Sequence, residues 1–171
     1  MHALAERLAR GEEAAFAELY DASADRLHRY LAALLRSRDT ASDVVQTAFL
    51  KAVKSRRLFR GVENPVAYLF QIARNEAMRS GSRRRVNERP LEAADLRAAS
   101  PTTGQWDDAD VVAAALAKLG DEDREIVDLK LFAGLTFREI ADVLNVPLAT
   151  VATKYRRALE SLRPWLEKQF R

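Results

Sequence analysis

The clearest chemistry in this sequence is carried by a run of threonine, lysine and arginine near the C-terminus. Five such residues fall within eight positions: Thr150, Thr153, Lys154, Arg156 and Arg157. Arginine and lysine can donate hydrogen bonds to guanine edges or phosphate oxygens, and threonine can contact either. The run therefore predicts a surface that binds nucleic acid, with an ordinary solvated basic helix face as the alternative interpretation.

Two predicted helices joined by a short turn position this run. The first opens with a capping box, because the Thr136 hydroxyl can accept from the Glu139 amide while the Glu139 carboxylate reaches back. The turn at Asn145 and Val146 leads into Pro147, whose fixed φ suits the first turn of a second helix. The apolar residues expected to face the core from this second helix are Val151, Tyr155, Leu159 and Leu162. The pattern is typical of a helix-turn-helix that enters a major groove, or of a plain helical hairpin.

The N-terminal half begins with two more predicted helices. Apolar residues at helical spacing predict a long helix over residues 12–35. A second capping box, Thr40 to Asp43, is expected to open the next helix. Its predicted exposed side includes Asp43 and Gln46.

A third N-terminal helix follows a basic loop. Asn64 is its expected cap, Pro65 suits its first position, and the helix is expected to end near residues 80–82. One face of this helix is left to polar and aromatic residues, namely Tyr68, Gln71, Arg74, Asn75 and Arg79. That face is a candidate surface for binding.

Arginines and aromatic rings in this same region suit single-stranded nucleic acid. Arg83, Arg84 and Arg85 are consecutive and could neutralise phosphates, although a charge run is often only a solvated helix end. Aromatic rings that could stack on unpaired bases are Phe59, Tyr68 and Phe70, although such rings are more often core.

Charge is distributed unevenly along the chain. Residues 1–89 hold 17 basic side chains against 11 acidic ones, whereas residues 90–110 hold one against five. We predict a domain at 1–89, a flexible acidic linker at 90–109 and a second domain at 110–171. No segment alternates with a period of two, so the predicted fold class is all-α, with two small helical domains.

Several functional classes find little support in the composition. The sequence has no cysteine, its six glycines are scattered, and His2 and His28 are far apart, so we predict no catalytic site, metal site or cofactor. The N-terminus lacks the apolar core of a signal peptide, and no run reaches membrane-spanning length. We expect a cytoplasmic protein without membrane insertion.

In its N-terminal half, the order of these motifs resembles region 2 of the extracytoplasmic-function sigma factors of bacterial RNA polymerase. Residues 41–49 look like the family's polymerase-docking helix, which implies that Asp43 and Gln46 face the clamp coiled coil of the core enzyme. Residues 64–75 look like the element that reads the promoter −10 region, with Tyr68 where the family usually has tryptophan. The resemblance and the arginine cluster assign −10 DNA binding to Tyr68, Arg74, Asn75, Arg79, Arg83, Arg84 and Arg85.

The C-terminal half is similar to region 4 of the same family, which reads the −35 element. Residues 135–141 fit its signature, and residues 149–153 stand where the family usually has Gly-Thr-Val-Lys-Ser, without the lysine. The −35 contacts implied by the match are Thr150, Thr153, Lys154, Arg156 and Arg157.

The resemblance implies three partners: core RNA polymerase, promoter DNA and an anti-sigma factor that holds the free protein inactive. The free protein is expected to be a monomer. Two other functions stay open at this stage. One is a stand-alone helix-turn-helix regulator that binds paired duplex half-sites. The other is a sigma-like decoy that binds an anti-sigma factor without supporting transcription.

Overall fold

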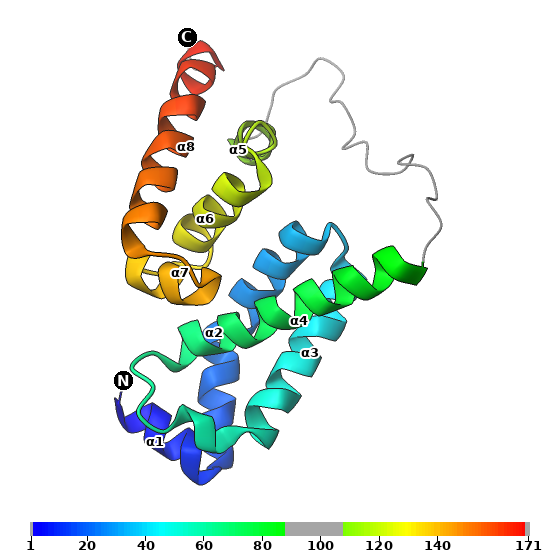
Figure 1. The fold of residues 1–171 in the computed structure, drawn as a ribbon, viewed down its shortest axis with the longest axis vertical. Helices are drawn as coiled ribbons and strands as arrows, with labels where there is room; N and C mark the ends of the chain where they lie inside the picture. The colour runs from blue at the N-terminus through cyan, green and yellow to red at the C-terminus, as the bar shows by residue number, and fades with distance from the viewer. Residues whose placement is uncertain (1, 88–107, 170–171) are drawn as a thin grey trace.

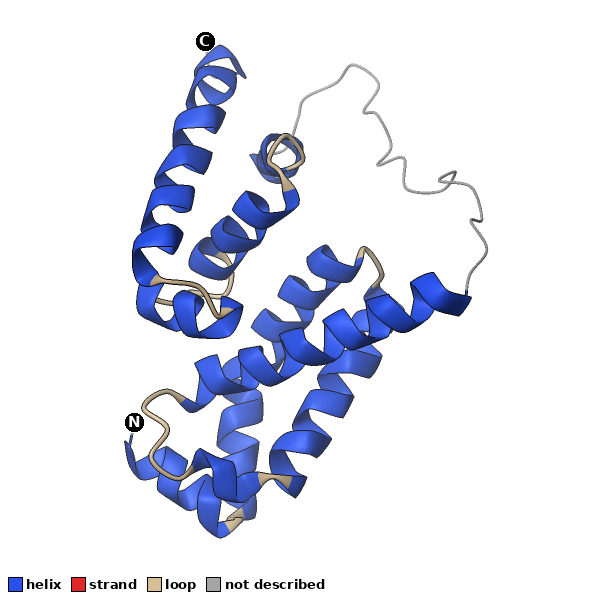
Figure 2. Cartoon of the chain, in the orientation of Figure 1, coloured by secondary structure: helices blue, strands red, loops and turns tan. Residues whose placement is uncertain are grey.

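The computed structural model describes residues 2–87 and 108–169, and side chains within 3–80 and 111–168 except Ala113. Every regular element in these ranges is a helix, which confirms the predicted all-α fold (Figure 2). In chain order the elements are α1 (His2–Arg10), α2 (Glu13–Leu35), α3 (Arg38–Lys54), the 3₁₀ turn η1 (Arg56–Phe59), α4 (Pro65–Asn87), α5 (Asp108–Leu116), α6 (Asp121–Leu131), α7 (Phe137–Leu144) and α8 (Leu148–Gln169) (Figure 1).

The predicted linker at 90–109 lies outside the described residues, except for its last two positions, which begin α5. The proposed domain limits therefore stay predictions. Below, the N-terminal module means α1 to α4, and the C-terminal module means α5 to α8. None of the helices in the described ranges is long and apolar enough to cross a membrane.

Helices α2 and α3 form a hairpin with a tight turn (Figure 1). Helix α2 ends at Arg36, which adopts left-handed backbone angles, and Ser37 caps α3 by accepting from the Thr40 amide at 3.3 Å. The predicted capping box at Thr40 and Asp43 is therefore wrong. Thr40 is buried within the first turn of α3, where its hydroxyl contacts the Ser37 hydroxyl at 2.9 Å.

Helix α4 packs on both members of this hairpin and starts as predicted. The Asn64 side-chain oxygen accepts from the amides of Val66 and Ala67 at 2.9 and 3.1 Å. The expected end near residues 80–82 is wrong, because α4 continues to Asn87. An interior glycine such as Gly81 costs a helix only about 1 kcal/mol relative to alanine, and the arginines that follow favour a helix.

Helix α1 and η1, which the sequence did not indicate, pack together at one end of the N-terminal module (bottom of Figure 1). Leu8 of α1 is fully buried. Phe59 of η1 is also fully buried, with its ring edge-on to Phe16 and Tyr68 at centroid distances of 6.4 and 5.2 Å. A segment predicted as a basic loop therefore supplies a core residue.

The C-terminal module contains the predicted helix-turn-helix. Thr136 accepts from the Glu139 amide at 3.3 Å, and Glu139 accepts from the Thr136 amide at 2.7 Å, so the capping box of α7 is confirmed. Asn145 ends α7 with left-handed backbone angles. Along α8 the buried stripe includes Ala158, and the predicted core residue Leu159 is 41% exposed. The spacing of 3.6 residues per turn explains the error.

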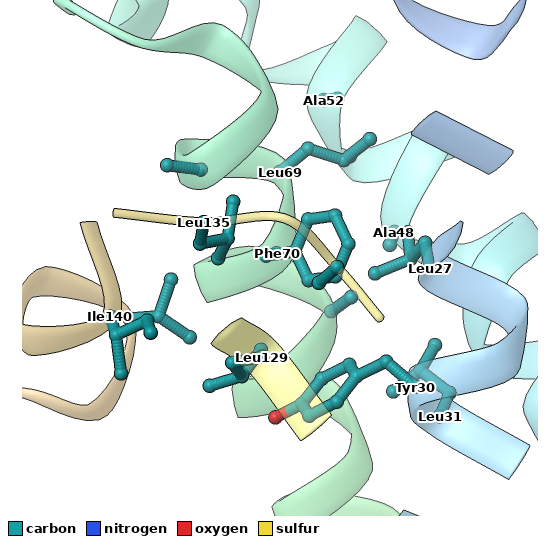
Figure 3. Packing of buried hydrophobic residues seen from close by; sticks show 14 of the residues in the cluster. Leu27, Tyr30, Leu31, Ala48, Ala52, Leu69, Phe70, Leu129, Leu135 and Ile140 are labelled. Carbon is teal, nitrogen blue, oxygen red and sulfur yellow. The ribbon is translucent and has the colours of Figure 1, made fainter. Parts of the chain in front are cut away.

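The two modules share a hydrophobic core, which the sequence did not predict. Figure 3 shows Leu129, Leu135 and Ile140 of the C-terminal module facing Phe70 of α4 and Tyr30 of α2. All five side chains are at most 2% exposed. The C-terminal module also has a smaller core of its own, formed by Ala115, Leu116, Val127, Ala158 and Leu162. The two helical domains are thus present as predicted, and they pack against each other.

Candidate nucleic-acid and polymerase interfaces

Helix α4 divides the predicted −10 residues between two faces. Asn75 and Arg79 lie one turn apart and are exposed, which suits contact with DNA. Tyr68 is half-buried and packs edge-on against Phe59. Phe59 and Phe70 are fully buried, so the suggested stacking of these two rings on bases is wrong. Of the three candidate rings, Tyr68 alone is partly accessible.

Arg74 points from α4 toward the C-terminal module. Its Nε and Nη2 donate to the two carboxylate oxygens of Glu125 at 2.8 and 3.2 Å, and the Tyr30 hydroxyl donates to the same carboxylate at 2.6 Å. The Glu125 hydrogen bond raises the pKa of Arg74, and burial, followed by the Glu125 charge, raises the pKa of Tyr30 well above its usual value. Arg74 is thus charged and already occupied by a carboxylate.

A groove of about 770 Å³ runs between α4 and the start of the helix-turn-helix. Asn64 donates from its Nδ2 to Glu139, and Gln71 donates from its Nε2 to the Asp142 carbonyl at 3.1 Å. The same groove is lined by Tyr68. The part of α4 that the resemblance assigns to the −10 element therefore lies directly beside α7.

The arginine cluster lies in the last turns of α4. The backbone at Arg83, Arg84 and Arg85 is helical, and their side chains fall outside the described residues. Their assignment to −10 DNA stays a prediction.

On α8 the predicted −35 residues reach the surface. Thr153, Arg156 and Arg157 are exposed, while Thr150 and Lys154 are half-buried. All five fall in the first ten residues of α8, the half that follows the helix-turn-helix turn. The predicted exposed face of the recognition helix is thus present.

Acidic residues at the start of α6 pair with two of these cations. Lys154 Nζ pairs with Glu122, and Arg157 Nη2 lies 3.4 Å from Asp123 Oδ2. The Lys154 hydrogen bond lowers the pKa of Glu122. Sequence reasoning missed these carboxylates, although four acids within residues 121–125 are an available signal.

A second groove, of about 470 Å³, separates α2 from α3. Its rim is apolar and accessible to solvent: Tyr20 is 53% exposed, Leu50 54% and Val53 44%. Gln46 lines the groove, and Asp43 is exposed one turn earlier on the same helix. An apolar groove with a polar margin is suited to a partner helix. The resemblance identified the two polar residues but not the apolar rim.

Two family models match successive parts of the chain, in the order that the resemblance predicts. Sigma-70 region 2 matches residues 19–89, and sigma-70 region 4 matches residues 109–162. Together the matches cover most of the sequence and contain α4, the α2–α3 groove and the helix-turn-helix.

Curated relatives are similar over almost their whole length. The ECF RNA polymerase sigma factor SigK of Mycobacterium ulcerans is 29% identical over 98% of this chain and 94% of the relative. The RNA polymerase sigma factor CarQ of Myxococcus xanthus is also 29% identical, over 94% of each chain. This chain therefore spans nearly the full length of both relatives.

Solved structures share the fold. CnrH, solved in complex with the cytosolic domain of CnrY, aligns with a TM-score of 0.69 over 98% of this chain and 97% of that chain, at 24% identity. The sigma factor RpoE of Bartonella quintana, solved in complex with the anti-sigma factor NepR, aligns with a TM-score of 0.63 over 82% of this chain and 89% of that chain, at 26% identity. The paired region 2 and region 4 matches and these full-length relatives confirm the resemblance, and the chain belongs to the extracytoplasmic-function sigma factors, the promoter-specificity subunits of bacterial RNA polymerase.

Proposed function

We propose that this sigma factor binds core RNA polymerase through the groove between α2 and α3. The observation that carries the proposal is the apolar rim of that groove, because exposed Tyr20, Leu50 and Val53 form a contiguous surface beside Gln46. Burying such a rim against a helix of the clamp would be favourable by about 25 cal/mol per Å². Asp43 and Gln46 at the margin would fix the orientation of the partner helix.

We assign −10 binding to α4. Asn75 and Arg79 are accessible for a base edge and a phosphate, and Tyr68 offers a partly exposed ring for an unpaired base. Arg74 and the Arg83 to Arg85 cluster complete the proposed set. Arg74 is paired with Glu125, so it becomes available to DNA only when this pair separates.

The −35 contacts are assigned to the exposed face of α8. Thr153, Arg156 and Arg157 are exposed in the first half of α8, with Thr150 and Lys154 half-buried beside them. In a helix-turn-helix this is the part of the second helix that would enter the major groove. The absence of the family's usual lysine at Ala152 leaves Lys154, Arg156 and Arg157 as the cations of this segment.

Family membership also supports the remaining assignments. We propose a cytoplasmic protein without enzymatic activity of its own, monomeric when free, that is held inactive by an anti-sigma factor. The complex of Bartonella quintana RpoE with NepR supports this last partner. The polymerase and the sigma subunit open the promoter together, so no cofactor is required.

Equilibrium binding of the fluorescently labelled protein to purified core polymerase tests the groove. Asp43→Ala and Gln46→Ala should each weaken binding by about fivefold, and Leu50→Asp by at least about tenfold, because the rim would then carry a charge against an apolar partner. Circular dichroism should be unchanged, since all three side chains are exposed.

Asp21→Ala is the matched control, because Asp21 is an exposed carboxylate on α2 outside the groove. It should bind core polymerase as the parent does. Parental affinity in all three groove variants would remove the docking assignment, and a parent that does not bind core at all would favour a stand-alone regulator.

A further inference from the structure

The start of α6, residues 121–125, is here called the acidic turn. Its four carboxylates each pair with a cation from another element, two in the N-terminal module and two on α8. The pairs are Asp121–Arg36, Glu122–Lys154, Asp123–Arg157 and Glu125–Arg74. Three of the four cations belong to the proposed DNA-binding sets. One turn of helix therefore neutralises cations that serve both promoter elements.

The four pairs differ strongly in environment. The Asp121 and Glu122 side chains are 94% and 80% exposed, so solvent screens their pairs and each contributes little to stability. Glu125 is only 11% exposed and accepts from both Arg74 and Tyr30. A paired arginine–carboxylate contact in a desolvated position is among the stronger hydrogen-bonded contacts in proteins. Of the four carboxylates of the acidic turn, Glu125 therefore makes the strongest contact.

Glu125 also joins the two modules. Tyr30 comes from α2, Arg74 from α4 and Glu125 from α6, and Figure 3 shows the Tyr30 hydroxyl pointing toward the C-terminal module. Next to it lies the shared apolar core of Phe70 and Leu129. The contact would leave a buried charge without a partner if either side were removed.

This geometry is incompatible with use of Arg74 by DNA. A carboxylate and a phosphate present the same pair of acceptor oxygens to a guanidinium, so one excludes the other at Arg74. Glu125 would in addition repel a phosphate brought to the same place. Helix α7 beside Asn64 and Gln71 restricts access to this part of α4 further.

We propose that Glu125 occupies Arg74 and Tyr30 in place of a DNA phosphate and thereby holds the free sigma factor in a closed state. The two modules must separate at this contact before α4 receives the −10 strand. The proposal rests on the proposed assignment of Arg74 to −10 DNA. Glu125 thereby lowers the affinity of the free protein for promoter DNA, because only the fraction of molecules with separated modules can bind it.

The test measures the distance between modules in the free protein by energy transfer between two dyes. The chain has no cysteine, so Asp21→Cys and Lys168→Cys place one label on each module at exposed positions. In this labelled background Glu125→Gln should lower the transfer efficiency. The affinity of the unlabelled Glu125→Gln protein for a single-stranded −10 oligonucleotide should rise by about three- to tenfold.

Glu167→Gln is the matched control, since it removes one exposed carboxylate from α8 far along the helix and changes the net charge equally. It should leave the transfer efficiency and the oligonucleotide affinity unchanged. If Glu125→Gln behaves as this control does in both measurements, Glu125 does not hold the closed state.

Tyr30→Phe covers the case in which Glu125→Gln fails to fold. It keeps the buried ring and removes only the hydroxyl that donates to Glu125, so a smaller opening in the same direction is expected. Unchanged transfer in a folded Tyr30→Phe protein would count against the proposal. Transcription by the parent with core polymerase is scored separately, so a failure of sigma activity is distinguishable from a failure of the closed state.

Discussion

Asp128 lies on α6, where its side chain is only 10% exposed. Burial, partly offset by Arg124 and reinforced by Glu125, raises the pKa of Asp128 to about 6. Its Oδ2 is 3.7 Å from Arg124 Nε, too far for a hydrogen bond, and among the described side chains that Nε is a buried nitrogen without a partner. The folded protein therefore holds this carboxylate in an unfavourable charged form at neutral pH.

Asp128→Asn should remove a pH dependence of stability. Because the pKa of Asp128 is raised in the folded protein, the folded state binds a proton there more tightly than the unfolded chain does. This contribution to the free energy of unfolding is fully present below about pH 4 and is lost as the pH rises through about 6. Relative to the parent, the variant should therefore gain up to about 3 kcal/mol at pH 7.5 and nothing at pH 4. Urea unfolding across this range measures the difference.

Asp21→Asn provides the comparison, since Asp21 is exposed on α2. Its stability should follow that of the parent at every pH. A stability difference between Asp128→Asn and the parent that stays constant from pH 4 to 7.5 would contradict the assigned pKa.

Arg157 tests the recognition face of α8. Its side chain is 67% exposed and only loosely paired with Asp123, so it can turn toward a phosphate or a base. Arg157→Ala should weaken binding to a −35 duplex by about five- to tenfold. If the lost contact is to a phosphate, the slope of log affinity against log salt concentration should become shallower by about one.

Arg163→Ala is the control on the same helix, because Arg163 is 79% exposed and pairs with Glu167 beyond the proposed face. Fluorescence anisotropy at several salt concentrations reads out both variants. Equal affinities for Arg157→Ala and the parent would place the −35 contacts elsewhere.

Capping decides where the helices begin, and here the sequence was partly misread. Thr136 and Asn64 cap α7 and α4 as predicted, because each stands directly before an apolar periodic run. At α3 the sequence predicted a cap at Thr40, but the structure uses Ser37, three residues earlier. Local pattern alone cannot separate them, since both residues offer a hydroxyl to an amide three positions later.

Ser37→Ala should therefore destabilise the fold by about 1 kcal/mol through the lost cap of α3. Ser55→Ala at the other end of the same helix should cost less than about 0.5 kcal/mol, because no hydrogen bond of its side chain supports the helix end. Urea midpoints at constant m-value compare the two. A smaller loss for Ser37→Ala than for Ser55→Ala would rule out Ser37 as the cap.

At the scale of the whole molecule, the local sequence pattern predicted the two modules but not the contact between them. Periodicity and turn residues predicted most helices and placed Asn75, Arg79, Arg156 and Arg157 on exposed faces. The partners of Arg74 could not be predicted, because Glu125 is 51 residues away along the chain and pairing over that distance depends on tertiary packing. The same holds for the burial of Phe59.

With the proposed assignments, the shared core and the acidic turn would close the free chain while the other proposed DNA-binding residues stay on the surface. Arg74 is covered at the contact between modules, whereas Asn75, Arg79 and Arg157 remain accessible. The proposed docking of core polymerase at the α2–α3 groove would leave the opposite side of α4 able to separate from α6 and α7. We therefore expect the function to depend on opening of the interface between the two modules.

Run-off transcription is the most direct test of the central claim. Purified core polymerase is supplied with genomic promoter fragments, with and without this protein, and the start sites of the transcripts are mapped. We expect discrete transcripts only when the protein is present, starting downstream of paired −35 and −10 elements, and far fewer with Gln46→Ala. Transcripts that are the same with and without the protein would contradict its assignment as a promoter-specificity subunit.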